Sequence, residues 1–151
     1  MIDFRLATPG DADRLFDWRN DPMTLACFRS TAVVPREDHD RWMKFNVENG
    51  FGEHIVLIAQ DGGQPIGVIR FDADREDIMS YDVSITVAPE HRERGLASMM
   101  LARACDLVQD FSLNAEVKQE NQASKKVFER CGFAIVGSDD RYVNYRRNPA
   151  G

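Results

Sequence analysis

Residues 80–98 decide the fold, and they read Ser-Tyr-Asp-Val-Ser-Ile-Thr-Val-Ala-Pro-Glu-His-Arg-Glu-Arg-Gly-Leu-Ala-Ser. The first eight residues alternate between apolar side chains on one face and polar side chains on the other, with Val83 and Ile85 opposite Asp82 and Ser84. This period of two is typical of a half-buried strand. Pro89 has no N–H to donate to a sheet, so the strand is predicted to end at Val87.

A helix is predicted to follow this strand after a basic loop. Apolar residues recur at helical spacing, at Leu96, Met100, Ala104, Leu107, Val108 and Phe111. The free N–H groups of a helix start attract anions, Gly95 and Ala97 let a ligand approach the backbone, and Arg92 and Arg94 add positive charge. The loop therefore suits a phosphate or pyrophosphate, and the alternative is an ordinary capping turn with surface charges. Neither the Walker pattern nor the dinucleotide fingerprint is present.

The rest of the chain predicts one α/β domain over residues 1–151 with a mixed sheet. The first helix is predicted to begin after the capping sequence Thr8–Asp11 and to end before Asp21-Pro22. The other predicted helices are Arg36–Glu48 and Gln122–Arg130. The other predicted strands are Ile2–Leu6, Ile55–Ala59, Ile66–Phe71, Leu113–Lys118, Phe133–Val136 and Tyr142–Arg146.

Composition limits the classes of function. The net charge of −6 argues against a nucleic-acid surface. The three cysteines, Cys27, Cys105 and Cys131, are odd in number and lack metal-ligand spacing, so neither a disulfide framework nor a metal site is expected. No apolar run follows Met1 and none is long enough to cross a bilayer, so no membrane association and a cytoplasmic location are expected.

Two sequence blocks resemble the GNAT acetyltransferase superfamily. Arg92-x-x-Gly95-x-Ala97 is similar to its acyl-CoA pyrophosphate loop, and Asn121 to Phe133 is similar to a second, downstream block. The resemblance implies an α/β (α+β) fold with a mostly antiparallel central sheet, flanked by helices and splayed between strands 4 and 5. It also implies an N-acetyltransferase that uses acetyl-CoA as co-substrate, and it leaves a homodimer open. The cofactor-binding residues implied are Val87, Arg92, Arg94, Gly95, Leu96, Ala97, Ser98, Asn121, Ser124 and Phe128.

Direct acetyl transfer to an amine requires a base, because an alkylamine of pKa near 10.4 is mostly protonated at pH 7. Three residues are candidates. Glu116 points toward the splay if Ala115 and Val117 face the core, Asp82 lies on the polar face of the fourth strand, and His39 has the most suitable ordinary pKa. The structural alternatives are a solvent-facing or ion-paired carboxylate for each acid and a packed histidine beside Trp42.

The N-terminal part, residues 16–42, resembles GNAT enzymes that acetylate nucleotide-linked amino sugars in the pseudaminic-acid pathway. This resemblance implies a small-molecule amine acceptor, with Arg19, Asn20, Ser30 and His39 near the substrate and Glu116 as a base acting through water. Related N-terminal blocks occur in polyamine and ribosomal-protein acetyltransferases, so a polyamine or a protein N-terminus is an alternative acceptor.

Two residues depart from the superfamily pattern. Phe128 stands where the family usually has a tyrosine proposed to protonate the leaving thiolate, and Glu93 stands where the loop often has glycine. A thiol pKa of about 8.5 makes thiolate a tolerable leaving group, so a slower enzyme is expected. Ser124, Tyr81, Tyr142, water or the substrate ammonium are alternative proton sources. A non-catalytic acyl-CoA-binding module is the alternative from another class.

Overall fold

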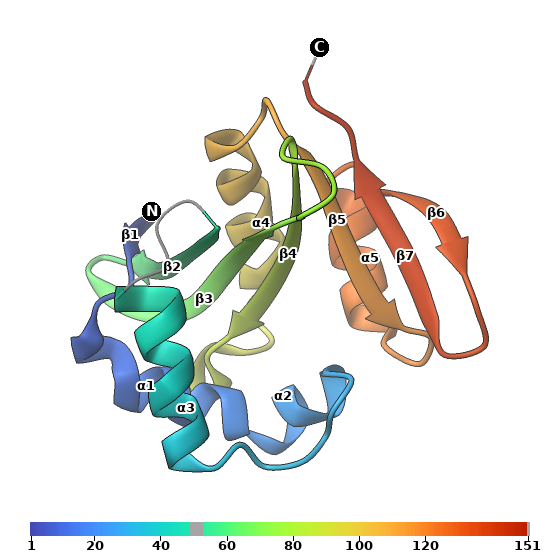
Figure 1. Cartoon of the computed structure of the whole chain (residues 1–151). Helices are drawn as coiled ribbons and strands as arrows, with labels where there is room; N and C mark the ends of the chain where they lie inside the picture. Colours follow the sequence, from blue (N-terminus) through green and yellow to red (C-terminus); the bar gives the residue numbers. More distant parts are fainter. Residues whose placement is uncertain (49–52, 151) are drawn as a thin grey trace.

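The chain folds into one seven-stranded sheet with helices on both faces (Figure 1). The structure is a computed structural model that describes residues 1–48 and 53–150. The strands are β1 (Ile2–Leu6), β2 (His54–Asp61), β3 (Gln64–Ala73), β4 (Ser80–Val87), β5 (Ser112–Lys118), β6 (Ala134–Ser138) and β7 (Tyr142–Arg147). The α-helices are α1 (Ala12–Asn20), α2 (Pro22–Cys27), α3 (Arg36–Met43), α4 (Leu96–Leu107) and α5 (Gln122–Arg130), and a π-helical turn, Lys44–Glu48, continues α3.

The strand order is β1-β2-β3-β4-β5-β7-β6, and every neighbouring pair is antiparallel except β4 and β5. That parallel pair is joined only at the beginning of both strands, where Ser80–Asp82 lies beside Ser112–Asn114. β4 continues to Val87 and β5 to Lys118, but no further pairs join them. The sheet is therefore splayed between its fourth and fifth strands, as the sequence resemblance implied.

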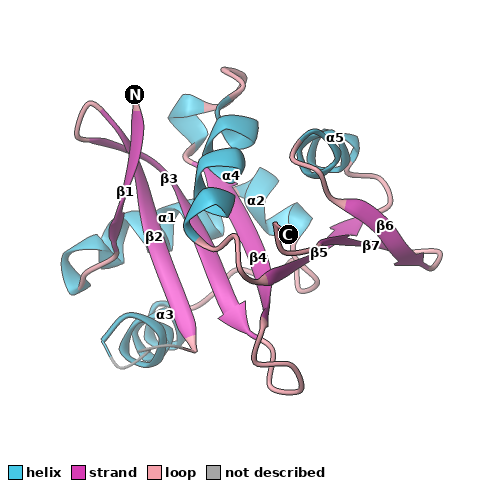
Figure 2. Cartoon of the chain, turned by 90° about the horizontal axis from the view of Figure 1, so that it is seen from above, coloured by secondary structure: helices cyan, strands magenta, loops and turns pink. Residues whose placement is uncertain are grey.

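Helices cover both faces of the sheet (Figure 2), and alternating side chains of the central strands build a core on each face. On β2, Leu57 and Ala59 belong to the larger core, which α4 covers with Met100 and Leu101. Ile58 faces the other way and packs with residues of α1 and α3, among them Leu15, Trp18 and Met43. The two helical layers thus close opposite faces, and both layers reach the splay.

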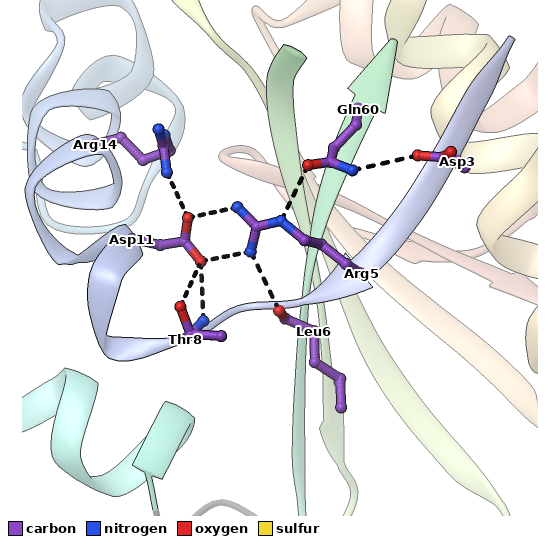
Figure 3. Close-up of polar contacts among 7 residues, drawn as sticks. All are labelled: Asp3, Arg5, Leu6, Thr8, Asp11, Arg14 and Gln60. Atoms are coloured by element: carbon purple, nitrogen blue, oxygen red, sulfur yellow. Dashed lines mark hydrogen bonds and ion pairs between the residues drawn. The ribbon is translucent and has the colours of Figure 1, made fainter. Parts of the chain in front are cut away.

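A buried carboxylate anchors the start of α1 to β1 (Figure 3). Asp11 is 1% exposed; it accepts two 2.8 Å hydrogen bonds from the Arg5 guanidinium and others from Arg14 and the Thr8 backbone N–H. Burial alone would raise the pKa of Asp11, but these donors outweigh it and lower the pKa to about 2. The carboxylate therefore stays ionised and fixes the direction in which α1 leaves the sheet.

Most predicted elements are confirmed, several to the residue. β1, β4 and α5 have the predicted bounds, and the predicted helix Arg36–Glu48 is α3 with its π-helical turn. The sequence analysis does not predict the short helix α2, because it interprets Asp21-Pro22 only as the end of the first helix. Proline is also favourable in a first helical turn, and the Asp21 carboxylate accepts the Thr24 N–H as a cap. The predicted apolar face of α4 was wrong at Leu107, which is 61% exposed because the helix ends there.

All three cysteines are free thiols, and Cys105 is buried in the core. Within residues 1–48 and 53–150, no cluster of three or more His, Cys, Asp or Glu side chains is arranged to hold a metal ion. None of the helices in those ranges is long and apolar enough to span a bilayer. The single-domain prediction over residues 1–151 includes residues 49–52 and 151, which lie outside the described part of the chain.

Candidate active site

The splay opens a cavity of about 870 Å³, here called the splay cavity. Its lining includes Asp82, Ser84 and Ile85 from β4 and Ala115 and Glu116 from β5. Beyond Asp82 the edge of β4 that faces β5 has no strand partner in the described chain, so backbone groups there are free to bind an extended ligand. Val87, predicted to bind cofactor, lies on this stretch and pairs on its other side with Gly67 of β3.

The loop that leads from β4 into α4 has the backbone of an anion site. Gly95 precedes the helix in the left-handed conformation with φ of 69°, and Glu93 also has a positive φ, of 63°. Glycine adopts this conformation at little cost, whereas the same geometry at Glu93 is strained, as is common at binding loops. No side chain caps α4, so the N–H groups of its first turn are not taken by a side-chain acceptor. The Glu93 side chain is exposed, as expected for a carboxylate beside an anion site.

The two arginines of this loop differ in their contacts. The Arg92 guanidinium is tied to the Asp21 carboxylate and donates a 2.9 Å hydrogen bond to the Thr24 hydroxyl, so it joins the loop to α2. Arg94 is exposed and donates to Nδ1 of His91 at 2.8 Å. That bond places the imidazole proton on Nε2, which is buried and has no partner among the described residues. A buried donor without an acceptor beside an open helix start fits an anionic ligand here.

The remaining predicted cofactor residues lie in different environments, and of them only Phe128 lines the splay cavity. Leu96 is buried in the core, whereas Ala97 and Ser98 are half-buried in the first turn of α4. Asn121 caps α5 by accepting the Ser124 N–H at 3.1 Å and donates its amide to the Cys27 thiol. Phe128 lines the splay cavity but packs as a core residue against Phe133 and Tyr145. The capping role proposed as the structural alternative for Asn121 is therefore present.

Glu116 lies in the splay, and Ala115 and Val117 face the core, as predicted. Its carboxylate accepts two hydrogen bonds from Arg29, one of them 2.7 Å from Nε to Oε1. Arg29 follows α2, and its guanidinium also lies 4.3 Å from the centre of the Tyr142 ring. This pair bridges the two sides of the splay. The two bonds from Arg29 leave other lone pairs of the Glu116 carboxylate able to accept a hydrogen bond from water or a substrate.

Asp82 lines the same cavity, but among the described residues no arginine is paired with it. Burial raises the pKa of Asp82, and three neighbouring carboxylates raise it further, those of Asp74, Asp72 and Glu116. An acid whose pKa is raised toward neutrality is a stronger base when ionised. The structure therefore places two carboxylates at the splay with different surroundings: Glu116, which is paired with Arg29, and Asp82, whose pKa is raised.

Two of the predicted substrate residues, Arg19 and His39, lie around a second cavity of about 450 Å³, here called the aromatic cavity. Arg19 and His39 line it together with Trp18, Phe28 and Trp42. His39 donates from Nε2 to the Ala12 carbonyl at 3.1 Å and stacks on Trp42, so only Nδ1 can accept a proton. Burial lowers the pKa of His39, which keeps it neutral at pH 7.

Asn20 and Ser30, the other predicted substrate residues, differ from these two. The Asn20 amide is engaged at both ends with the Val34 backbone, at 3.0 and 2.7 Å, so it has a structural role in holding the chain after α2. Ser30 is exposed and lines the splay cavity. Arg19, Phe28, Arg70 and Ser84 line both cavities, which are therefore adjacent.

Sequence reasoning missed three residues of these cavities. Arg29 pairs with Glu116, Arg70 lies 5.8 Å from the centre of the Trp42 ring, and Tyr145 lines the splay and donates to the Glu129 carboxylate. Burial and the Glu129 carboxylate raise the pKa of Tyr145 to about 12. No motif singles out any of them; only the alternation of β3 and β7 could have placed Arg70 and Tyr145 on a chosen face.

The fold and cavities together define a class: an α/β protein with a sheet splayed at a parallel strand pair, an uncapped helix start at one end of the splay and carboxylates inside it. The acetyltransferase (GNAT) domain family matches residues 2–134 of the chain. The chain belongs to this family, which confirms the broader of the two sequence resemblances.

Individual relatives agree with this assignment. The acetyltransferase Pat of Mycolicibacterium smegmatis is 24% identical over 140 residues, which cover 89% of this chain and 42% of Pat, so the chain spans about two fifths of that relative's length. The crystal structure of a candidate phosphinothricin N-acetyltransferase superposes with a TM-score of 0.82 at 24% identity over the whole of both chains. Spermidine N-acetyltransferase from Vibrio cholerae, in complex with CoA and spermine, superposes with a TM-score of 0.80 at 19% identity over 96% of this chain and 92% of its own.

Proposed function

We propose that this protein is an acetyl-CoA-dependent N-acetyltransferase that transfers the acetyl group directly to a primary amine of a small molecule, a nucleotide-linked amino sugar. The observation that carries the proposal is the splay itself. β4 and β5 separate after Asp82 and leave a cavity with an unpaired strand edge and carboxylates, and the loop after β4 leads to an uncapped helix start. These are the parts that an extended, anionic thioester and an amine need in order to meet.

Acetyl-CoA supplies an activated thioester, and this chain's residues fit the molecule that carries it. The backbone from Arg92 to Ser98, with Gly95 in the left-handed conformation, is proposed to bind the pyrophosphate. Among the residues that the structure describes, Arg94 forms no ion pair, whereas Arg92 is tied to Asp21 and holds the loop against α2. Val87 and the unpaired edge of β4 are proposed to hydrogen-bond the pantetheine arm, with Asn121 and Ser124 facing it from α5.

Asp82 and Glu116 are proposed as the groups that remove the proton from the acceptor amine. The raised pKa of Asp82 favours it as the direct base. Glu116 would act through water with a lone pair that Arg29 does not occupy, and His39, whose neutral Nδ1 remains available, is the third candidate. General-base catalysis typically contributes about 100- to 10,000-fold in rate, so removing the correct group has a large effect.

Phe128 cannot protonate the departing thiolate. Tyr81 is buried between Phe71 and Phe111 in the core, so it is a poor candidate donor. Tyr142 packs under Arg29 at the edge of the splay, and Ser124 is half-buried at the start of α5. We propose that water or Ser124 supplies this proton.

The test is thiol release from acetyl-CoA with UDP-linked 4-amino sugars, spermidine and N-terminal peptides as acceptors, with calorimetric CoA binding as the control. Turnover with the nucleotide sugars supports the proposal. Turnover with spermidine or peptides but not with the nucleotide sugars supports an acetyltransferase that has a different acceptor. CoA binding without turnover on any acceptor supports a binding module instead.

The base is assigned with Asp82→Asn and Glu116→Gln, and Asp106→Asn on the exposed side of α4 is the matched control. The variant that loses the base is expected to bind CoA normally and to lose at least about 100-fold in kcat. If both variants keep full turnover, neither carboxylate is the base, and His39→Gln becomes the next variant.

A further inference from the structure

The aromatic cavity is large enough for part of a small-molecule acceptor. Its volume of about 450 Å³ lies within the range of ligand sites, and its walls include both tryptophans of the chain, Trp18 and Trp42. It adjoins the splay cavity because Arg19, Phe28 and Arg70 line both. An amine held in the splay would therefore extend its remaining atoms toward these aromatic walls.

Arg19 brings an uncompensated positive charge into this cavity. Its Nη1 is buried and has no hydrogen-bond acceptor among the described residues, and its guanidinium lies 3.6 Å from the centre of the Phe28 ring. No carboxylate of residues 1–48 and 53–150 forms an ion pair with it. A buried, unpaired N–H of a charged group is costly, and native proteins seldom leave one without a purpose.

The other ionisable groups that line the cavity do not neutralise Arg19. Arg70 is paired with Asp72 at 2.9 Å, Asp38 is paired with Arg41, and burial keeps His39 neutral at pH 7. Burial and the nearby charge of Arg70 lower the pKa of Arg19. Both causes act against the charged form of the guanidinium.

The splay cavity contains carboxylates as well as arginines. It is lined by Asp72, Asp74, Asp82 and Glu116, and the pKa of Asp82 is raised in part by the other three carboxylates. Carboxylates therefore lie where the amine is proposed to react, and the Arg19 guanidinium lies beside aromatic rings where the two cavities adjoin.

We infer that the acceptor carries an anionic group, a carboxylate or a phosphoryl group, as well as its amine, and that Arg19 binds this anion in the aromatic cavity. The inference deepens the proposed function and rests on it for the position of the amine. A guanidinium suits planar or tetrahedral oxyanions, and the missing partner of Nη1 is an acceptor of this kind. A polyamine is disfavoured, because its second ammonium would lie beside Arg19 and Arg70.

Tryptophan fluorescence tests this directly, because both tryptophans line the cavity. The probes are phenyl phosphate and benzoate, with benzyl alcohol as the neutral control, titrated into the protein without acetyl-CoA. Saturable binding of at least one anion, at least about 10-fold tighter than benzyl alcohol, is expected from a charge-assisted hydrogen bond. The tighter of the two anions identifies the group.

The variants assign the effect to Arg19. Arg19→Gln is expected to remove the preference for the anion, Arg19→Lys to keep part of it, and Arg103→Gln on the exposed side of α4 to leave it unchanged. Equal binding of benzyl alcohol and both anions by the unmodified protein would overturn the inference, as would an anion preference that survives in Arg19→Gln.

This outcome is independent of the proposed function. The probes carry no amine and need no turnover, so anion binding at Arg19 stands even if no acceptor is acetylated. Efficient acetylation of spermidine with no anion binding would refute the inference about Arg19 and still support the proposed acetyltransferase activity. If Arg19→Gln does not fold, the comparison of probes on the unmodified protein still decides.

Discussion

Replacing Asp11 with asparagine tests how the position of α1, and with it Trp18 and Arg19, is maintained. The buried carboxylate holds Arg5, Arg14 and the Thr8 N–H in one cluster, and its pKa falls from 3.8 to about 2 (Figure 3). A shift of this size corresponds to about 2 kcal/mol of folding free energy at pH 7. Asp11→Asn removes the charge and keeps the shape, so it is expected to lower the unfolding free energy by about that amount and Tm by about 4–8 °C.

The pH dependence makes this prediction sharper. A depressed carboxyl pKa contributes stability that is complete above its unfolded value of 3.8 and is lost as the pH falls toward about 2. The difference between the unmodified protein and Asp11→Asn should therefore shrink to about 1 kcal/mol by pH 3. Urea unfolding at both pH values measures it. Asp13→Asn, which removes an exposed carboxylate from the same helix, is the control and should cost less than about 0.5 kcal/mol. A difference that does not change between pH 7 and pH 3 would refute the reasoning.

Three further predictions concern the sheet, the anion loop and the splay. Gly67→Ala places a Cβ 2.5 Å from the Thr86 carbonyl oxygen, so it should lower the free energy of unfolding, measured in urea, by about 1–3 kcal/mol or more. An unchanged free energy of unfolding would mean that β3 and β4 can separate. Arg94→Ala should weaken CoA binding about 10-fold, measured by calorimetry, without changing Tm. Arg92→Ala should also lower Tm, because it breaks the link to Asp21. Equal melting temperatures for the two variants would contradict the structural role of Arg92. Cys27 is exposed and lines the splay cavity, so a thiol reagent should modify it before the other two cysteines. Bound CoA should slow this modification, and a rate that CoA does not change would mean that CoA binds elsewhere.

The sequence predicted the regular elements well because their signals are local. Alternation along Ser80–Val87 and helical spacing after Leu96 report which side of an element is buried, and the capping residues mark its ends. The two failures occurred where one local signal has two meanings. Pro22 ends α1 and begins α2, and Leu107 keeps the apolar spacing but is the exposed last residue of α4.

The sequence by itself determined the order of the elements, the loop that precedes α4 and the identity of the family. Those properties depend on residues within a few positions of one another, and hydrogen bonds and side-chain periodicity act over that range. Only the tertiary structure decided how the charged side chains of the site are paired. Arg92 meets Asp21, Glu116 meets Arg29, and Arg19 meets no carboxylate in the described chain. Partners more than seventy positions apart are brought together by the packing of helices on the sheet, so no spacing in the sequence could have revealed them.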